Sequence, residues 1–138
     1  MNDQKPNPKQ VIAAYFRNFE NGPEDEDFWS WQYIWELVLH DPELAWKIIL
    51  GLVAAAPSSD ALGYVGADCL EDLLMYHGTE FIDRIRIEAA RDKRFLAALY
   101  SARVSETDAV FKQLMELKRE LGINERGPEL PQDLFATK

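Results

Sequence analysis

The chain has 138 residues, of which 47% are hydrophobic and 12% aromatic, and its formal net charge is -9 at pH 7. A chain of this length and apolar content can bury the core of one domain, which excludes an intrinsically disordered protein. Because Cys69 is the only cysteine, an intrachain disulfide is excluded, and the acidic balance argues against a nucleic-acid-binding protein.

The first two helices are predicted at residues 8–21 and 24–40. Apolar residues recur at helical spacing in both, and the segment 21–23, Asn-Gly-Pro, separates them. Four acids suit the first turn of the second helix, where the helix dipole favours negative charge. The predicted core face of this helix comprises Phe28, Trp31, Ile34, Trp35, Val38 and Leu39, and the far side carries Trp29, Tyr33 and Leu37.

A third helix is predicted to start at Asp41-Pro42, because Asp is a good N-cap and Pro suits the first helical position. It is expected to end near Ala56. Ser59 or Asp60 is expected to cap the fourth helix.

The fourth helix is predicted to end at Gly78, where a glycine after His77 is typical of a left-handed C-terminal cap. Cys69 lies between Val65 and Leu73 on the apolar stripe of this helix and is expected to be a buried, unreactive side chain. Gly63 and Gly66 are expected to let two helices approach closely. His77 and His40 are interpreted as helix-end residues and not as catalytic groups.

Three further helices complete the prediction. Thr79 is expected to cap the fifth, and Asp92 is expected to restart the chain as a sixth. Ser105 followed by Asp108 approximates a capping box for the last helix, which should continue to Gly122.

We therefore predict an all-α fold of about six or seven short helices in antiparallel pairs, either HEAT-like or an irregular helical bundle. Residues 1–122 are expected to form a single helical domain. Residues 123–138 contain two prolines and no period, which indicates a C-terminal tail. A repeat of about 40 residues, as a HEAT-like solenoid would have, is not evident.

The charges are unevenly distributed along the chain. Residues 18–83 contain fourteen acids and one lysine, whereas residues 84–103 contain six bases and two acids. Acidic surfaces speed association with basic partners, so this separation favours a basic protein partner.

No catalytic, metal-binding or cofactor-binding motif is evident, so we expect neither an enzyme nor a cofactor. Asp68, Glu71 and Asp72 are interpreted as a solvated face. The longest apolar run, residues 48–56, is too short for a membrane span, and the first ten residues lack a hydrophobic signal segment. We therefore expect a cytoplasmic protein without a membrane or nucleic-acid partner.

Three segments resemble an uncharacterised bacterial family of the domain-of-unknown-function kind. They are HDPELAW at 40–46, VGADCLEDLLMYHG at 65–78 and DKRFLAAL at 92–99. The resemblance covers roughly residues 28–104 and implies a small helical bacterial protein without an assigned activity. In size, acidity and helix content the chain also looks like the immunity proteins that neutralise bacterial toxins.

These observations predict a non-enzymatic, acidic protein-binding module, with an immunity-type inhibitor of a basic bacterial toxin as its most concrete form. The predicted partner-binding residues combine aromatic side chains with neighbouring acids: Asp25, Glu26, Asp27, Trp29, Tyr33 and Glu36. Two alternatives remain open: a structural homo-oligomer that pairs acidic with basic halves, and an enzyme with a site of carboxylates and His77.

Overall fold

The computed structural model describes residues 6–124, 127–128 and 134–135, and over these residues it contains helices and no strands. The elements in chain order are α1 (Pro8–Asn21), α2 (Phe28–His40), α3 (Pro42–Ala55), α4 (Ser59–Val65), the π-helical η1 (Gly66–Leu70), α5 (Glu71–Arg91), α6 (Lys93–Ser101) and α7 (Phe111–Glu120). The predicted all-α class is therefore confirmed.

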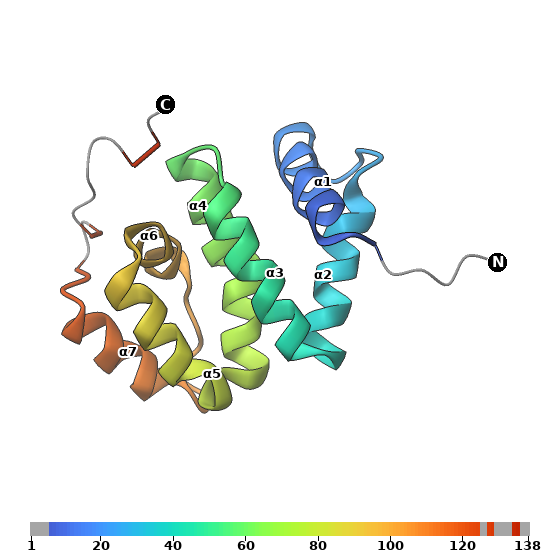
Figure 1. The fold of residues 1–138 in the computed structure, drawn as a ribbon. Helices are drawn as coiled ribbons and strands as arrows, with labels where there is room; N and C mark the ends of the chain where they lie inside the picture. Colours follow the sequence, from blue (N-terminus) through green and yellow to red (C-terminus); the bar gives the residue numbers. More distant parts are fainter. Residues whose placement is uncertain (1–5, 125–126, 129–133, 136–138) are drawn as a thin grey trace.

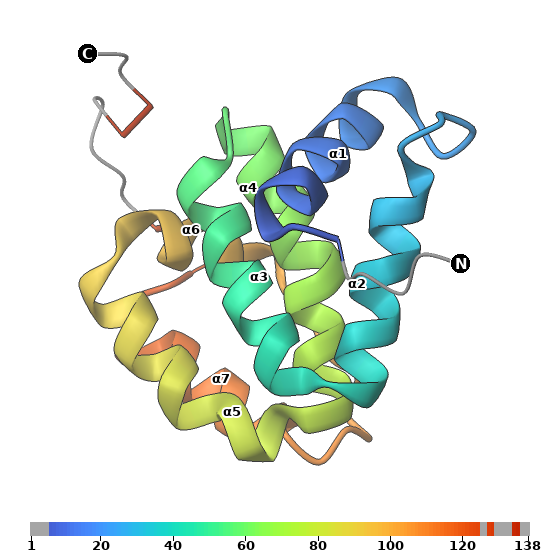
Figure 2. The same ribbon diagram turned by 45° about the vertical axis from the view of Figure 1, so that its right-hand side comes forward.

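A continuous rod of α4, η1 and the first half of α5 runs through the molecule (Figures 1 and 2). On one side of this rod lie α1 and α2, and on the other lie α6 and α7, while α3 packs along it. The helices cross at varied angles, so the arrangement is an irregular helical bundle. None of the described helices is long and apolar enough to cross a membrane.

The helix starts follow local capping chemistry. Asn7 caps α1, since its side chain accepts from the backbone N–H of Lys9 at 2.8 Å, and Asp41 caps α3 as predicted. The cap of α4 is Ser58, whose hydroxyl accepts from the backbone N–H of Ala61 at 3.1 Å. The prediction of Ser59 or Asp60 was therefore displaced by one or two residues.

Two expectations for the second helix were wrong. The helix begins at Phe28, because the preceding acids lie in turns and Asp27 binds Arg17. Trp31 and Trp35 are only half-buried, whereas Leu37, assigned to the far side, is 8% exposed. The reason is that α2 contacts α1, α3, α5 and η1, so that it is covered on more than one side.

The predicted end of a helix at Gly78 was also wrong. The helix α5 continues to Arg91 and only kinks at His77, whose φ of -140° and ψ of 19° are not helical. A Cβ on Gly78 would lie 2.6 Å from Cβ of Val110, so the glycine admits the chain that leads into α7. The Nε2 atom of His77 lies 2.7 Å from the carbonyl oxygen of Val38 and ties the kink to α2.

The contact between η1 and α6 also depends on a glycine. A Cβ on Gly66 would lie 1.8 Å from the carbonyl oxygen of Ala98, so these backbones meet directly. The expectation that Gly66 permits close approach is confirmed. On the same rod Cys69 is 2% exposed and Leu73 is fully buried, as their positions on the apolar stripe predicted.

The chain after α6 differs from the prediction at the start of its last helix. The Asp108 carboxylate accepts from the backbone N–H of Ser105 at 2.8 Å, but residues 106–110 form turns and α7 starts only at Phe111.

Within the predicted tail, Leu134 and Phe135 pack against the core, and the guanidinium of Arg94 lies 4.8 Å from the Phe135 ring centre. Residues 125–126, 129–133 and 136–138 of the tail lie outside the described residues.

Candidate functional site

Part of the predicted partner-binding set gathers at the start of α2. Asp27 is 7% exposed, and its carboxylate accepts two hydrogen bonds from Arg17 at 2.9 and 3.0 Å. The bonded Arg17 lowers the pKa of Asp27. Trp29 is 39% exposed and borders a hollow that Lys9 and Arg17 also line. This hollow therefore contains positive as well as negative side chains.

The other predicted residues are more dispersed. Asp25 accepts from the backbone N–H of Asp27 at 2.9 Å, and Glu26 is exposed in the same loop. Tyr33 is half-buried against the core, and the carboxylate of the exposed Glu36 lies 3.5 Å from His40. The structure thus brings Asp25, Asp27 and Trp29 together and leaves Tyr33 and Glu36 further along α2.

A second cluster is centred on Asp68 in η1. One carboxylate oxygen accepts from the Tyr15 hydroxyl at 2.7 Å, and the other accepts from the indole Nε1–H of Trp31 at 2.9 Å. Burial raises the pKa of Asp68, while the hydrogen bonds from Tyr15 and Trp31 act in the opposite direction. Three separate helical segments therefore hold one half-buried carboxylate in place.

Aromatic rings form a line beside this carboxylate. Phe28, Trp31 and Trp35 stack in succession along α2, with ring centres 5.2 and 6.4 Å apart and planes within 14° and 8° of parallel. Tyr76 on α5 meets Trp35 edge to face at 5.7 Å, and it is 50% exposed. The line of rings therefore extends from α2 across to α5.

Asp72 completes the cluster. It lies between Asp68 and Tyr76 on the rod, at spacings of four residues, which place all three on one side. Burial, followed by the charges of Asp68 and Glu71, raises the pKa of Asp72 to about 6. We define the aromatic–acidic face as Phe28, Trp31, Trp35, Tyr76, Asp68 and Asp72.

The two carboxylates of this face differ from four other acids of the described structure in having no arginine partner. Four acids are paired with arginines: Asp27 with Arg17, Glu43 with Arg84, Glu88 with Arg91 and Glu120 with Arg86. Over the described part of the chain, neither Asp68 nor Asp72 has a lysine or arginine within 4.0 Å.

Electron-rich ring faces attract cations, and Trp attracts them most strongly. A hollow of about 330 Å³, lined in part by Phe28, Trp31 and Tyr64, opens at one end of the face. The arrangement is chemically suited to a cation with an apolar stem, such as a lysine or arginine side chain.

Cys69 and His77 are next to residues of this face in the sequence. No group of three or more His, Cys, Asp or Glu side chains among the described residues could hold a metal ion. Burial raises the pKa of Cys69 well above its ordinary value, which keeps the thiol protonated. The Nε2 atom of His77 is engaged by the Val38 carbonyl.

The sequence prediction did not identify the aromatic–acidic face. It assigned Asp68 and Asp72 to a solvated face and Trp31 and Trp35 to the core, whereas all four are half-buried at one boundary. The available signal was spacing, because the tryptophans and the aspartates each recur after four residues.

A family model described as "Family of unknown function (DUF6869)" matches residues 18–121, well over half of the chain. The matched part contains every residue of the aromatic–acidic face but not Tyr15. Comparison with curated proteins and comparison with solved structures each give no match.

Proposed function

We propose, for a chain that belongs to the family of unknown function DUF6869, that the aromatic–acidic face binds a lysine or arginine side chain of a basic partner protein. The protein would then be a non-enzymatic binding module. The observation that carries this proposal is the position of Asp68 and Asp72. Both are half-buried beside a line of partly exposed rings, with no basic side chain within 4.0 Å among the described residues.

The energetics favour a cationic ligand. Burial raises the pKa of Asp72, and repulsion from the negative charges of Asp68 and Glu71 raises it further. A bound cation would offset this repulsion, and contact with a tryptophan ring would add about 0.5 to 2 kcal/mol. A neutral or acidic partner would gain neither term.

The charge distribution supports a protein as the source of that cation. Besides Asp68 and Asp72, residues 18–83 contain the other twelve of the fourteen acids, and such a field accelerates association with a basic protein. The finer form of the proposal is an immunity-type inhibitor of a basic bacterial toxin. Asp25, Glu26 and Trp29 would then form a secondary contact next to the face, with Tyr33 and Glu36 further along α2.

A hexa-arginine peptide provides a direct test, read by proton–nitrogen NMR correlation spectra. The indole N–H of Trp31 donates to Asp68, so its resonance reports on the centre of the face. We expect this resonance and that of Trp35 to shift on titration, more weakly as salt rises. Hexaglutamate should leave both in place.

Variants separate the face from general attraction to an acidic protein. Trp35→Leu and Asp72→Asn should each weaken binding of the peptide by about tenfold, which corresponds to about 1.4 kcal/mol. Glu116→Gln removes one negative charge, as Asp72→Asn does, but at an exposed position on α7. It is therefore the matched control for the change in charge. Equal loss of affinity in Asp72→Asn and Glu116→Gln, with no loss in Trp35→Leu, would reduce the interaction to net charge and contradict the proposal.

A further inference from the structure

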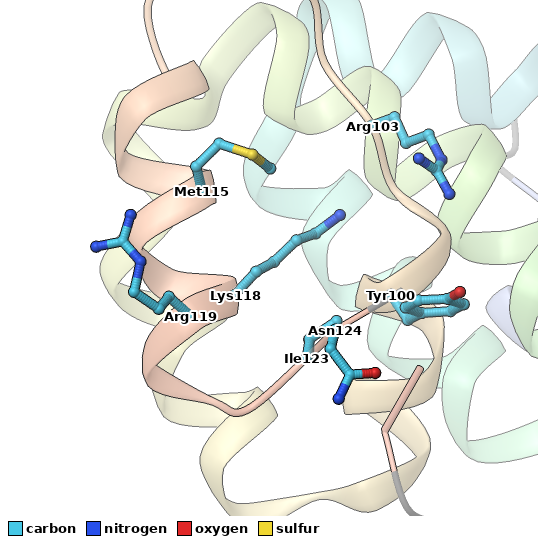
Figure 3. Close-up of a pocket in the computed structure, with 7 residues that line it drawn as sticks. All are labelled: Tyr100, Arg103, Met115, Lys118, Arg119, Ile123 and Asn124. Carbon is cyan, nitrogen blue, oxygen red and sulfur yellow. The ribbon is translucent and has the colours of Figure 1, made fainter. Parts of the chain in front are cut away.

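A second hollow, of opposite charge, lies between α6 and α7. It has a volume of about 480 Å³ and is lined by Tyr100, Arg103, Met115, Lys118, Arg119, Ile123 and Asn124 (Figure 3). We call this hollow the cationic pocket. Its three basic residues contrast with the overall charge of -9.

Lys118 occupies the centre of the cationic pocket. Figure 3 shows its side chain reaching from α7 toward the segment that carries Arg103, while Arg119 stands at the outer rim. The ammonium donates to the carbonyl oxygen of Ala102 at 2.5 Å. An ammonium group has three donors, so this bond leaves two for a ligand.

Over the described residues, the basic side chains of the cationic pocket form no ion pair with a carboxylate. Arg17, Arg84, Arg86 and Arg91 are each paired with an acid elsewhere. In the described residues neither the guanidinium of Arg103 nor that of Arg119 forms an ion pair. Burial lowers the pKa of Lys118, and the charge of Arg103 lowers it further, whereas Glu71 raises it.

We propose that the cationic pocket binds the phosphate group of a small organic phosphate monoester, with Lys118 and Arg103 as its main contacts and Arg119 at the rim. Guanidinium and ammonium groups form strong charge-assisted hydrogen bonds to phosphate oxygens. The side chains of Tyr100, Met115 and Ile123 provide apolar surface for the organic part. A nucleic-acid backbone is disfavoured, because the acids that dominate the rest of the chain would repel it.

Isothermal titration calorimetry with phenyl phosphate, inorganic phosphate and phenylacetate tests the ligand chemistry. Phenyl phosphate should bind most tightly, since it alone combines a dianionic group with an apolar ring. Comparable affinity for inorganic phosphate would contradict the role of the apolar wall. Tighter binding of phenylacetate would replace phosphate with carboxylate as the ligand class and overturn the proposal.

Variants of both signs test the residues. Arg103→Gln and Lys118→Met should each weaken binding of phenyl phosphate by about tenfold or more. Glu71→Gln should strengthen it, because this acid is the negative charge that acts on Lys118. A purely structural role for these residues would not produce a gain of affinity.

Arg91→Gln is the matched control, since it removes an arginine paired with Glu88 outside the cationic pocket. Because Lys118→Met also removes the bond to Ala102, circular dichroism should confirm that the variant is folded. If Lys118→Met is not folded, Arg103→Gln and Glu71→Gln decide the question. Unchanged affinity in both of these variants would overturn the proposal. None of these results depends on the hexa-arginine titration.

Discussion

Asp72 links the stability of the fold to pH at the scale of a single residue. Its pKa is raised to about 6, so the folded protein holds this proton more tightly than the unfolded chain does. The stability contributed by Asp72 is therefore greatest below its ordinary pKa of 3.8 and falls as the pH rises through about 6. Burial also raises the pKa of Asp68, which acts in the same direction.

Replacing Asp72 with asparagine should remove the loss of stability that ionisation of this carboxyl causes at neutral pH. We expect Asp72→Asn to have a higher Tm than the parent at pH 7 and a much smaller difference in Tm near pH 4, where the aspartate is almost fully protonated in the folded state and partly protonated in the unfolded chain. Thermal unfolding followed by circular dichroism measures both. The control is Asp83→Asn, at an exposed position outside the aromatic–acidic face. A stabilisation that is larger near pH 4 than at pH 7 would contradict this account.

Residue burial could be predicted from the sequence where helical spacing alone decided it. Cys69 and Leu73 lie on an apolar stripe, and both are buried. The environment of Asp68 could not be predicted in this way, because its hydrogen-bond partners, Tyr15 and Trp31, are 53 and 37 residues away. Only the packing of three segments makes this aspartate different from a solvated one.

At the scale of elements, the contact between η1 and α6 depends on the missing side chain of Gly66. A Cβ there would meet the backbone carbonyl of Ala98 at 1.8 Å, which no side-chain rotation relieves. At Gly63, one helix turn earlier, the nearest atom is the hydroxyl oxygen of Ser101 at 3.3 Å, which can rotate away. Gly66 and Gly63 are therefore a test site and a control site for substitution by alanine.

We expect Gly66→Ala to destabilise the fold by about 1 to 3 kcal/mol or more, because α6 must move away from η1. Gly63→Ala should be neutral or stabilising by up to about 1 kcal/mol, since alanine favours the helix more than glycine does. Urea unfolding of both variants measures the difference. Equal effects of the two substitutions would show that helix propensity, and not the close contact, is decisive.

The start of α3 could be predicted from the sequence, whereas the kink in α5 and the π-helical turn could not. The cap at Asp41 is a local hydrogen bond between neighbours, so the sequence contains all that is needed to recognise it. His77-Gly78 resembles a helix end in sequence, but the glycine serves the approach of Val110 from a distant segment. The π-helical turn at Gly66–Leu70 had no recognised sequence signal either.

For the whole molecule, opposite charges are arranged around one residue. Glu71 influences the carboxylates of the aromatic–acidic face and also Lys118 in the cationic pocket. Its own carboxylate accepts from the backbone N–H of Arg103 at 2.8 Å, which fixes its position. The sequence predicted separated charge but not this adjacency, which arises when the segment after α6 folds back onto the start of α5.

This charge arrangement also bears on self-association. The net charge of -9 makes two copies repel each other, so we expect a monomer at low and at physiological ionic strength. Light scattering coupled to size-exclusion chromatography measures the mass under both conditions. A dimer at low salt that dissociates as salt is added would favour the homo-oligomer alternative, with the acidic and basic regions of two copies in contact.

The burial of Cys69 gives the protein an intrinsic kinetic probe. It is the only thiol in the chain and is buried beside Asp68, so a thiol-specific reagent can reach it only after the rod has opened locally. The labelling rate then measures the free energy of that opening without any engineered residue. A ligand held by the neighbouring aspartates would slow the labelling in proportion to its occupancy, so one chemical reaction reports both on fluctuation and on binding.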